Sequence, residues 1–150
     1  MHPLPHRYHV RAEGGQADAV LVTAPDLPGL ETHAPPEFDG PPGYWSPESL
    51  LVASVADCYI LSFRAVARAS KLEWSSLTVD VEGVLDRADG VTRFVRFIVK
   101  PRLSIASEER ERLARTVLDK AKRACLVTNS LSAECELAPT VTVVQAAPVA

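Results

Sequence analysis

The sequence is short of the residues on which several classes of protein depend. Only three of its 150 residues are cysteine, 6% are aromatic, and the formal net charge is −3. An odd and small number of cysteines does not suit the disulfide scaffold of a small secreted domain. A weakly acidic chain with few aromatic residues also lacks the basic surface that binds nucleic acid, so we expect no nucleic-acid partner.

Other features that the sequence lacks argue against further classes of protein. The N-terminus, MHPLPHRYHV, has no apolar segment of the signal-peptide kind, and uninterrupted apolar runs fall short of a membrane span. We therefore expect a cytoplasmic protein without a membrane partner. His2, His6 and His9 lie in a proline-broken terminus without a nearby cysteine or carboxylate, so no metal is expected. A glycine-rich phosphate loop and a G-x-S-x-G motif are also lacking.

What the sequence does have is a proline-rich first third and a long apolar segment after it. Nine of the 12 prolines fall in residues 1–47, so residues 24–47 are expected to form an ordered loop or edge strands. Two short strands should precede them and turn at Gly14 and Gly15. Ser46 should then cap a helix that runs to about Lys71.

The second half alternates strand and helix patterns. Residues 77–103 predict a β-hairpin that turns at Asp89 and Gly90. Ser107 is expected to cap a second helix with one apolar face, formed by Leu113, Val117, Ala121 and Ala124. A last strand over residues 135–144 should be an edge strand or bulged, because it contains Pro139. The length suits a single domain over residues 1–150.

Cysteines supply the candidate chemistry. Cys58 follows Asp57 in the middle of the apolar helix, where it could simply fill a crowded seam. Cys125 ends the second helix in a polar segment, ACLVTNSL, where a thiol should be accessible. Two thiols in such different settings also suit an attacking and a resolving cysteine, and the residues alone leave both interpretations open. Cys135 alternates with Leu137 and is expected to face a core.

A thiolate at Cys58 would need stabilisation from elsewhere. Burial raises the pKa of a thiol, and a mid-helix position gains little from the helix N-terminus. A cation is therefore expected from another element, with Arg7 and Arg11 as candidates. Glu48 lies ten residues before Cys58, about 15 Å along a helix. Glu48 thus either only caps its own helix or reaches the thiol from a second chain, which requires a dimer.

Two segments resemble a known family. SPESLLVASVADC, residues 46–58, is similar to the N-P-E-x-L-L-x-A-x-x-x-C segment of the OsmC/Ohr family of osmotically induced and organic hydroperoxide resistance proteins, with Ser46 where asparagine is usual. KRACLVTNSL, residues 122–131, resembles the second segment of that family, in which hydrophobic residues and Ser/Thr-Asn follow a cysteine. The order of strands, long helix, hairpin, second helix and edge strand agrees as well.

The resemblance implies an α+β fold, built as an intertwined homodimer whose long central helices pack against antiparallel sheets. It implies a peroxidase for organic hydroperoxides that uses no metal, haem or other cofactor. Cys58 would be the peroxidatic thiol, Cys125 the resolving thiol, and Glu48 part of the polar network at Cys58. The reductant would be a dithiol of the lipoyl type.

One position departs from the family pattern. Hydroperoxide-resistance members carry an arginine just after the Gly-Gly turn, whereas this chain has Gln16. Gln16 can donate a hydrogen bond but brings no charge, so Arg7, Arg11 or another arginine would have to stabilise the thiolate. The alternative function is a non-enzymatic protein of the same fold that binds a small hydrophobic or thiol-reactive ligand.

Overall fold

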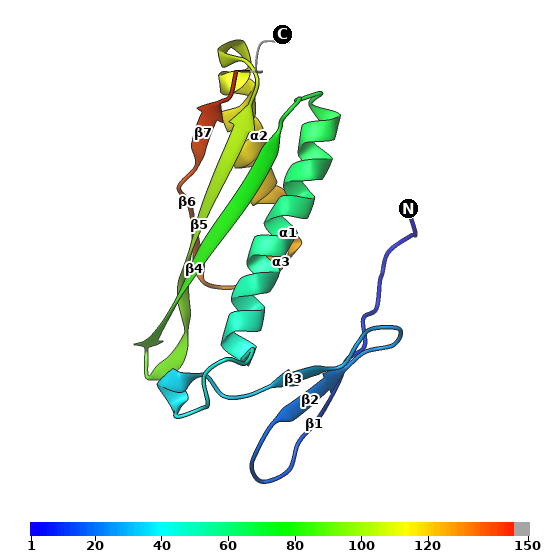
Figure 1. Cartoon of the computed structure of the whole chain (residues 1–150), viewed down its shortest axis with the longest axis vertical. Helices are drawn as coiled ribbons and strands as arrows, with labels where there is room; N and C mark the ends of the chain where they lie inside the picture. The colour runs from blue at the N-terminus through cyan, green and yellow to red at the C-terminus, as the bar shows by residue number, and fades with distance from the viewer. Residues whose placement is uncertain (146–150) are drawn as a thin grey trace. The chain divides into compact units, whose positions relative to one another are not determined.

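The computed structural model describes residues 1–145, which fall into two compact units, residues 1–51 and the chain from Val52 onward. Both α-helices and β-sheets are present, which confirms the α+β class. Figure 1 shows the elements in chain order, with the long helix α1 (Pro47–Ala69) following the proline-rich segment. The single domain over residues 1–150 stays a prediction.

The first unit is a small antiparallel sheet in the order β1-β2-β3. Its strands are β1 (Arg11–Glu13), β2 (Val20–Thr23) and β3 (Leu30–Thr32). The turn between β1 and β2 holds Gly14 and Gly15, as predicted. The proline-rich segment contributes only the edge strand β3 and the short 3-10 helix η1 (Pro36–Phe38), because proline interrupts longer pairing.

A reciprocal pair of hydrogen bonds starts α1. The Ser49 N–H donates to Ser46 Oγ over 3.1 Å, and the Ser46 N–H donates to Ser49 Oγ over 2.8 Å. This is a capping box in which serine takes the place of the usual acidic residue, and it confirms Ser46 as the cap. The helix ends two residues earlier than predicted, because Lys71 adopts a left-handed backbone with φ of 53°. The Leu72 N–H then closes the helix end on the Ala67 carbonyl over 2.9 Å.

A four-stranded sheet forms the centre of the second unit. Strands β4 (Ser76–Ala88) and β5 (Val91–Ile105) make the predicted antiparallel hairpin. Its turn residues Asp89 and Gly90 have φ of 53° and 76°, as a tight hairpin turn requires. Strands β6 (Glu134–Leu137) and β7 (Thr140–Val143) both run parallel to β5. Pro139 lies between them, so the single strand predicted over residues 135–144 is divided in two, and both parts lie at the edge of the sheet as predicted.

The two faces of this sheet differ in burial and polarity, because successive side chains of a strand point to opposite faces. The inner face of β5 is buried and consists of Phe97, Val99, Pro101, Leu103 and Ile105. The outer face carries ion pairs, such as Arg102 with Asp80 at 3.0 Å. Helix α1 runs along the sheet (Figure 1), and a Cβ atom on Gly83 would lie 2.7 Å from Val52 Cγ2. A glycine is therefore needed where the helix passes β4.

The second helical segment differs in part from the prediction. Ser107 has the extended backbone of a cap but makes no side-chain cap hydrogen bond, and residues 108–110 form the 3-10 helix η2 (Glu108–Arg110). Helix α2 (Glu111–Ala124) follows, and the short helix α3 (Leu126–Asn129) begins after Cys125. The buried face of α2 is rotated from the predicted one and consists of Ala114, Val117, Leu118 and Ala121. Leu113 is only half-buried and Ala124 is exposed, so both were wrongly assigned to the buried face.

Helix α1 is far more apolar than its burial in one chain explains. Its buried residues form a single row at a spacing of four: Val55, Tyr59, Phe63 and Ala67. A stretch of 18 consecutive residues of α1 has a mean hydropathy of 1.7, but only 22% of that stretch is buried in the described chain. By length and composition this one helix could cross a membrane, although the core helix of a soluble protein has the same features. The absence of a membrane partner therefore stays a prediction.

Candidate active site

The sulfur of Cys58 is surrounded by hydrogen-bond donors. They are the backbone N–H groups of Val127 and Leu126, the thiol of Cys125 and the hydroxyl of Ser62. Ser62 lies four residues after Cys58 on α1, and therefore on the same face of that helix. Leu126 and Val127 begin α3, where the first N–H groups have no partner within the helix and remain available.

These donors decide the protonation of Cys58. Burial, the largest single influence, raises its pKa, but the hydrogen bonds from Val127, Cys125, Leu126 and Ser62 together outweigh burial. The pKa of Cys58 is therefore lowered from its ordinary value, because each donor favours the thiolate over the thiol. None of these four donors is an arginine, and a contribution from a cation of another element stays a prediction.

Arg7 and Arg11, the arginines expected to stabilise the thiolate, belong to the unit formed by residues 1–51. Arg11 lies 3.7 Å from Glu13, and its side chain is 77% exposed. Arg7 is exposed in the N-terminal segment, and Gln16 is exposed in the turn between β1 and β2. A stabilising role for Arg7, Arg11 or another arginine therefore stays a prediction.

Cys125 is brought to Cys58 by the break between α2 and α3. Its backbone is extended, with φ of −68° and ψ of 108°. Its carbonyl accepts hydrogen bonds from the Thr128 hydroxyl at 3.2 Å and the Asn129 N–H at 3.0 Å. Cys125 is only 1% exposed, so the prediction of an accessible thiol in a polar turn was wrong. Both sulfurs belong to free cysteines, in hydrogen-bonding contact and without a disulfide.

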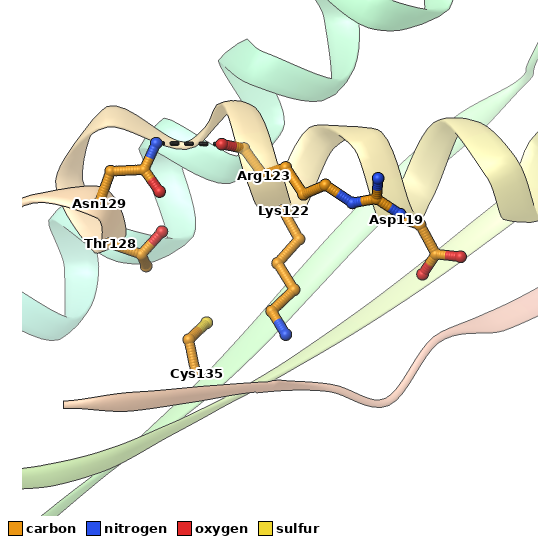
Figure 2. Close-up of a pocket in the computed structure, with 6 residues that line it drawn as sticks. All are labelled: Asp119, Lys122, Arg123, Thr128, Asn129 and Cys135. Atoms are coloured by element: carbon orange, nitrogen blue, oxygen red, sulfur yellow. Dashed lines mark hydrogen bonds between the residues drawn. The ribbon is translucent and has the colours of Figure 1, made fainter.

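Cys135 lies on the predicted inner face of β6, opposite Phe97. It is half-buried and does not lie in a closed core. It lines a cavity of about 450 Å³ with Asp119, Lys122, Arg123, Thr128 and Asn129. Figure 2 shows these lining side chains. Burial raises the pKa of Cys135, Lys122 lowers it and Cys125 raises it, with a net increase. Cys135 is thus electrostatically linked to the same thiol that contacts Cys58.

The carboxylate of Glu48 lies in surroundings that are unusual for a charged group. Its Oε2 atom is buried and has no hydrogen-bond partner within the described part of the chain. It lines an apolar cavity of about 500 Å³ whose other walls include Val20, Val22, Phe38 and Leu50. Ten residues of α1 separate Glu48 from Cys58, a helical rise of about 15 Å, so this side chain cannot reach the sulfur along its own helix.

Several of the groups around the Cys58 sulfur were not predicted from the sequence. Ser62 could have been found, because a spacing of four residues places it beside Cys58 on a helix. The N–H groups of Leu126 and Val127 leave no signal in side-chain identity.

Within residues 1–145 no three histidine, cysteine or acidic side chains gather in a way that could hold a metal ion.

Comparisons with known proteins agree with this architecture. The family model described as OsmC-like protein matches residues 40–139. The uncharacterized protein YmaD of Bacillus subtilis is 26% identical over 137 residues, which cover 88% of this chain and 91% of YmaD.

Solved structures show the same fold. An OsmC-like protein of unknown function from Vibrio cholerae matches with a TM-score of 0.79 and 16% identity, over 92% of this chain and 100% of that one. An organic hydroperoxide resistance protein OsmC from Legionella pneumophila matches with a TM-score of 0.74 and 22% identity, over 94% and 100%. The α+β fold that the resemblance implies is thereby confirmed, whereas the intertwined homodimer stays a prediction, and the chain belongs to the OsmC-like protein family.

Proposed function

We propose that this protein reduces organic hydroperoxides with a pair of cysteines, Cys58 as the peroxidatic thiol and Cys125 as the resolving thiol. The observation that carries the proposal is the set of donors around the Cys58 sulfur, which lowers its pKa and includes the Cys125 thiol itself. Family membership points to a peroxide-related redox role, and one structural relative is named an organic hydroperoxide resistance protein.

The first step is attack by the Cys58 thiolate on the O–O bond. The sulfur takes the distal oxygen and becomes a sulfenic acid, while the alkoxide leaves and takes up a proton to become an alcohol. The N–H groups of Leu126 and Val127 favour the thiolate that attacks. The Cys125 thiol then attacks the sulfenic sulfur, and water leaves as the disulfide forms.

An external dithiol completes the cycle. It reduces the Cys58–Cys125 disulfide and is itself oxidised to a cyclic or linear disulfide. The family resemblance points to a lipoyl-type donor. Three free cysteines suit the reducing cytoplasm that such a cycle requires.

Apolar side chains beside Cys58 favour an alkyl hydroperoxide over hydrogen peroxide. Leu61 lies one turn beyond Cys58 and is 53% exposed. Leu126, whose N–H donates to the Cys58 sulfur, is 75% exposed. Two large apolar side chains this open can contact the organic part of a substrate, which hydrogen peroxide lacks.

A homodimer would account for two further features. The apolar face of α1 is largely uncovered, and Glu48 Oε2 is buried without a partner in the described chain. Buried polar atoms normally have a hydrogen-bond partner, so a second copy could both cover α1 and bring Glu48 to the polar network at Cys58. We expect a twofold dimer by light scattering at micromolar concentration, and a monomer would contradict this part of the proposal.

Titration of free thiols tests the function. The reduced protein is treated with one equivalent of cumene hydroperoxide, and remaining thiols are counted. We expect a rapid loss of two thiols per chain in the wild type and no disulfide in a Cys58→Ser variant. A wild-type protein that keeps all three thiols would contradict the proposal.

The second candidate is a non-enzymatic binding protein. The cavity of about 500 Å³ with Val20, Val22, Phe38 and Leu50 in its walls favours it, because an apolar cavity with one carboxylate suits a small hydrophobic ligand. The same titration separates the two functions, because a binding protein would lose no thiols to the hydroperoxide.

A further inference from the structure

We propose that the cavity beside α2 is a modification site, in which Cys135 forms a mixed disulfide with a small thiol of the amino-acid or short-peptide type. The cavity has a volume of about 450 Å³, and all the residues that line it belong to the unit that begins at Val52. The peroxidase cycle proposed above does not use Cys135, so this inference does not depend on that cycle.

Cys135 supplies the nucleophile of the cavity. Its thiol is free and half-buried, and it lines the cavity directly. Its neighbours on β6, Glu134 and Glu136, point to the opposite face of the sheet because side chains alternate along a strand. On that face Glu136 pairs with Arg96 over 3.4 Å. The fold therefore separates the thiol from the two carboxylates that flank it in the sequence.

Two cations line the same cavity. Lys122 is half-buried, Arg123 is exposed, and within residues 1–145 neither side chain forms an ion pair. Figure 2 shows the Lys122 side chain extending from α2 toward the strand that carries Cys135. An ammonium and a guanidinium group without a partner can both donate charge-assisted hydrogen bonds to a carboxylate. A ligand that reaches the thiol is therefore expected to carry a carboxylate.

The remaining groups of the cavity accept hydrogen bonds. The carboxylate of Asp119 is exposed and lines the cavity. Asn129 donates through Nδ2 to the Arg123 carbonyl over 3.0 Å, which leaves its Oδ1 atom as an acceptor. The Thr128 hydroxyl donates to the Cys125 carbonyl over 3.2 Å and can only accept from a ligand. Cations and acceptors together match a ligand with both a carboxylate and an ammonium group, as amino acids and short peptides have. The volume of the cavity also suits a small molecule.

The modification is a thiol–disulfide exchange in which the small disulfide is the oxidant. Cys135 gives up its proton to solvent, and its thiolate attacks one sulfur of the small disulfide. The bond from Cys135 to that sulfur forms as the original S–S bond breaks, and the electron pair leaves on the other half as a thiolate. Burial raises the pKa of Cys135, and the Lys122 ammonium acts against this increase. Lys122 thus favours the attacking thiolate as well as the carboxylate of the ligand.

Two small disulfides of different charge test the site. Oxidised glutathione carries carboxylates and ammonium groups, whereas cystamine carries ammonium groups alone. The reduced full chain is incubated with each at equal concentration and quenched with iodoacetamide at increasing times. Tandem mass spectrometry then locates the adduct within the peptide that begins at Ala124 and holds Cys125 and Cys135.

The folded and the urea-unfolded chain should have opposite preferences at Cys135. In the folded protein we expect modification several-fold faster with oxidised glutathione than with cystamine. In urea the cavity is lost, and the carboxylates of Glu134 and Glu136 beside the thiol should favour the cationic cystamine. A folded protein that prefers cystamine at Cys135, or that takes up glutathione only at Cys58 or Cys125, would overturn the proposal.

Lys122→Gln isolates the contribution of the cavity. It should slow the modification of Cys135 by oxidised glutathione several-fold and should not slow the modification by cystamine. Lys120→Gln is the matched control, because Lys120 is exposed on the same helix but does not line the cavity, and it should change neither rate. An unchanged glutathione rate in Lys122→Gln would also contradict the proposed site. If this variant does not fold, the comparison of the folded and unfolded wild type still decides the question.

Discussion

Removal of the Ser62 hydroxyl should change the rate of Cys58 oxidation in a way that depends on pH. In the folded protein this hydroxyl donates to the Cys58 sulfur and favours its thiolate. It also lies 3.5 Å from the Ala124 carbonyl, at the limit of a hydrogen bond, so that second contact competes only weakly. Ser62→Ala therefore removes one donor and leaves those of Leu126, Val127 and Cys125 in place.

The size of the effect follows from the strength of one hydrogen bond to a charged group. Such a bond contributes about 1.5–3 kcal/mol, and the partly open site favours the lower end. A loss of about 1.4 kcal/mol reduces the thiolate population about tenfold at pH values below the pKa. A more basic thiolate is also about threefold more nucleophilic for such a change. The net result is oxidation about threefold slower at low pH and about threefold faster above the pKa.

Stopped-flow measurement of thiol oxidation by cumene hydroperoxide across pH 5–10 would show this crossing of the two rate profiles. Thr116→Ala is the matched control, because it removes a helix hydroxyl that donates to the Arg112 carbonyl instead of to a sulfur. Its profile should coincide with that of the wild type. Superimposable profiles for Ser62→Ala and the wild type would refute the role of the donors in holding the thiolate.

Two further predictions concern stability and its dependence on pH. Gly83→Ala should lower the free energy of unfolding in urea by about 1–3 kcal/mol, because its Cβ would lie 2.7 Å from Val52 Cγ2; unchanged stability would contradict the close packing of α1 on β4. Because folding lowers the pKa of Cys58, its thiolate contributes stability above the ordinary thiol pKa, and this is lost as pH falls through the folded value. The stability difference between reduced wild type and Cys58→Ser should therefore shrink as pH falls, and a difference independent of pH would argue against a stabilised thiolate.

The sequence predicted those parts of the fold that depend on local chemistry. The Ser46 cap, the Asp89–Gly90 turn and the edge position of the segment around Pro139 were all confirmed, because each depends on the backbone preference of one or two residues. The buried face of α2 was displaced by about one residue, since Leu118 and Ala114 pack inward instead of Leu113 and Ala124. Helical periodicity alone does not determine which side of α2 faces α1. In the structure the Tyr59 hydroxyl of α1 donates a hydrogen bond to the Leu118 carbonyl of α2 over 3.0 Å.

The contact between Cys58 and Cys125 agrees with the prediction from sequence, whereas their catalytic roles stay a prediction. The pairing of Cys58 and Cys125 came from their two sequence segments, and the structure places the two thiols in contact. The stabilisation of the thiolate could not be predicted, because the donors from α3 are backbone groups that any residue except proline supplies. Cys135 was assigned to a core from strand alternation, which gives the face of a strand but not the cavity that α2 and α3 leave beside it.

Trapping of the oxidised sulfur tests the central role of Cys58 most directly. In a Cys125→Ser variant the sulfenic acid has lost its resolving partner and should persist after one equivalent of cumene hydroperoxide. Dimedone, which reacts with sulfenic acids, should then label Cys58 stoichiometrically, with mass spectrometry locating the adduct. Labelling at Cys135 in place of Cys58, or no labelling while the hydroperoxide is still consumed, would contradict the assignment of Cys58 as the peroxidatic thiol.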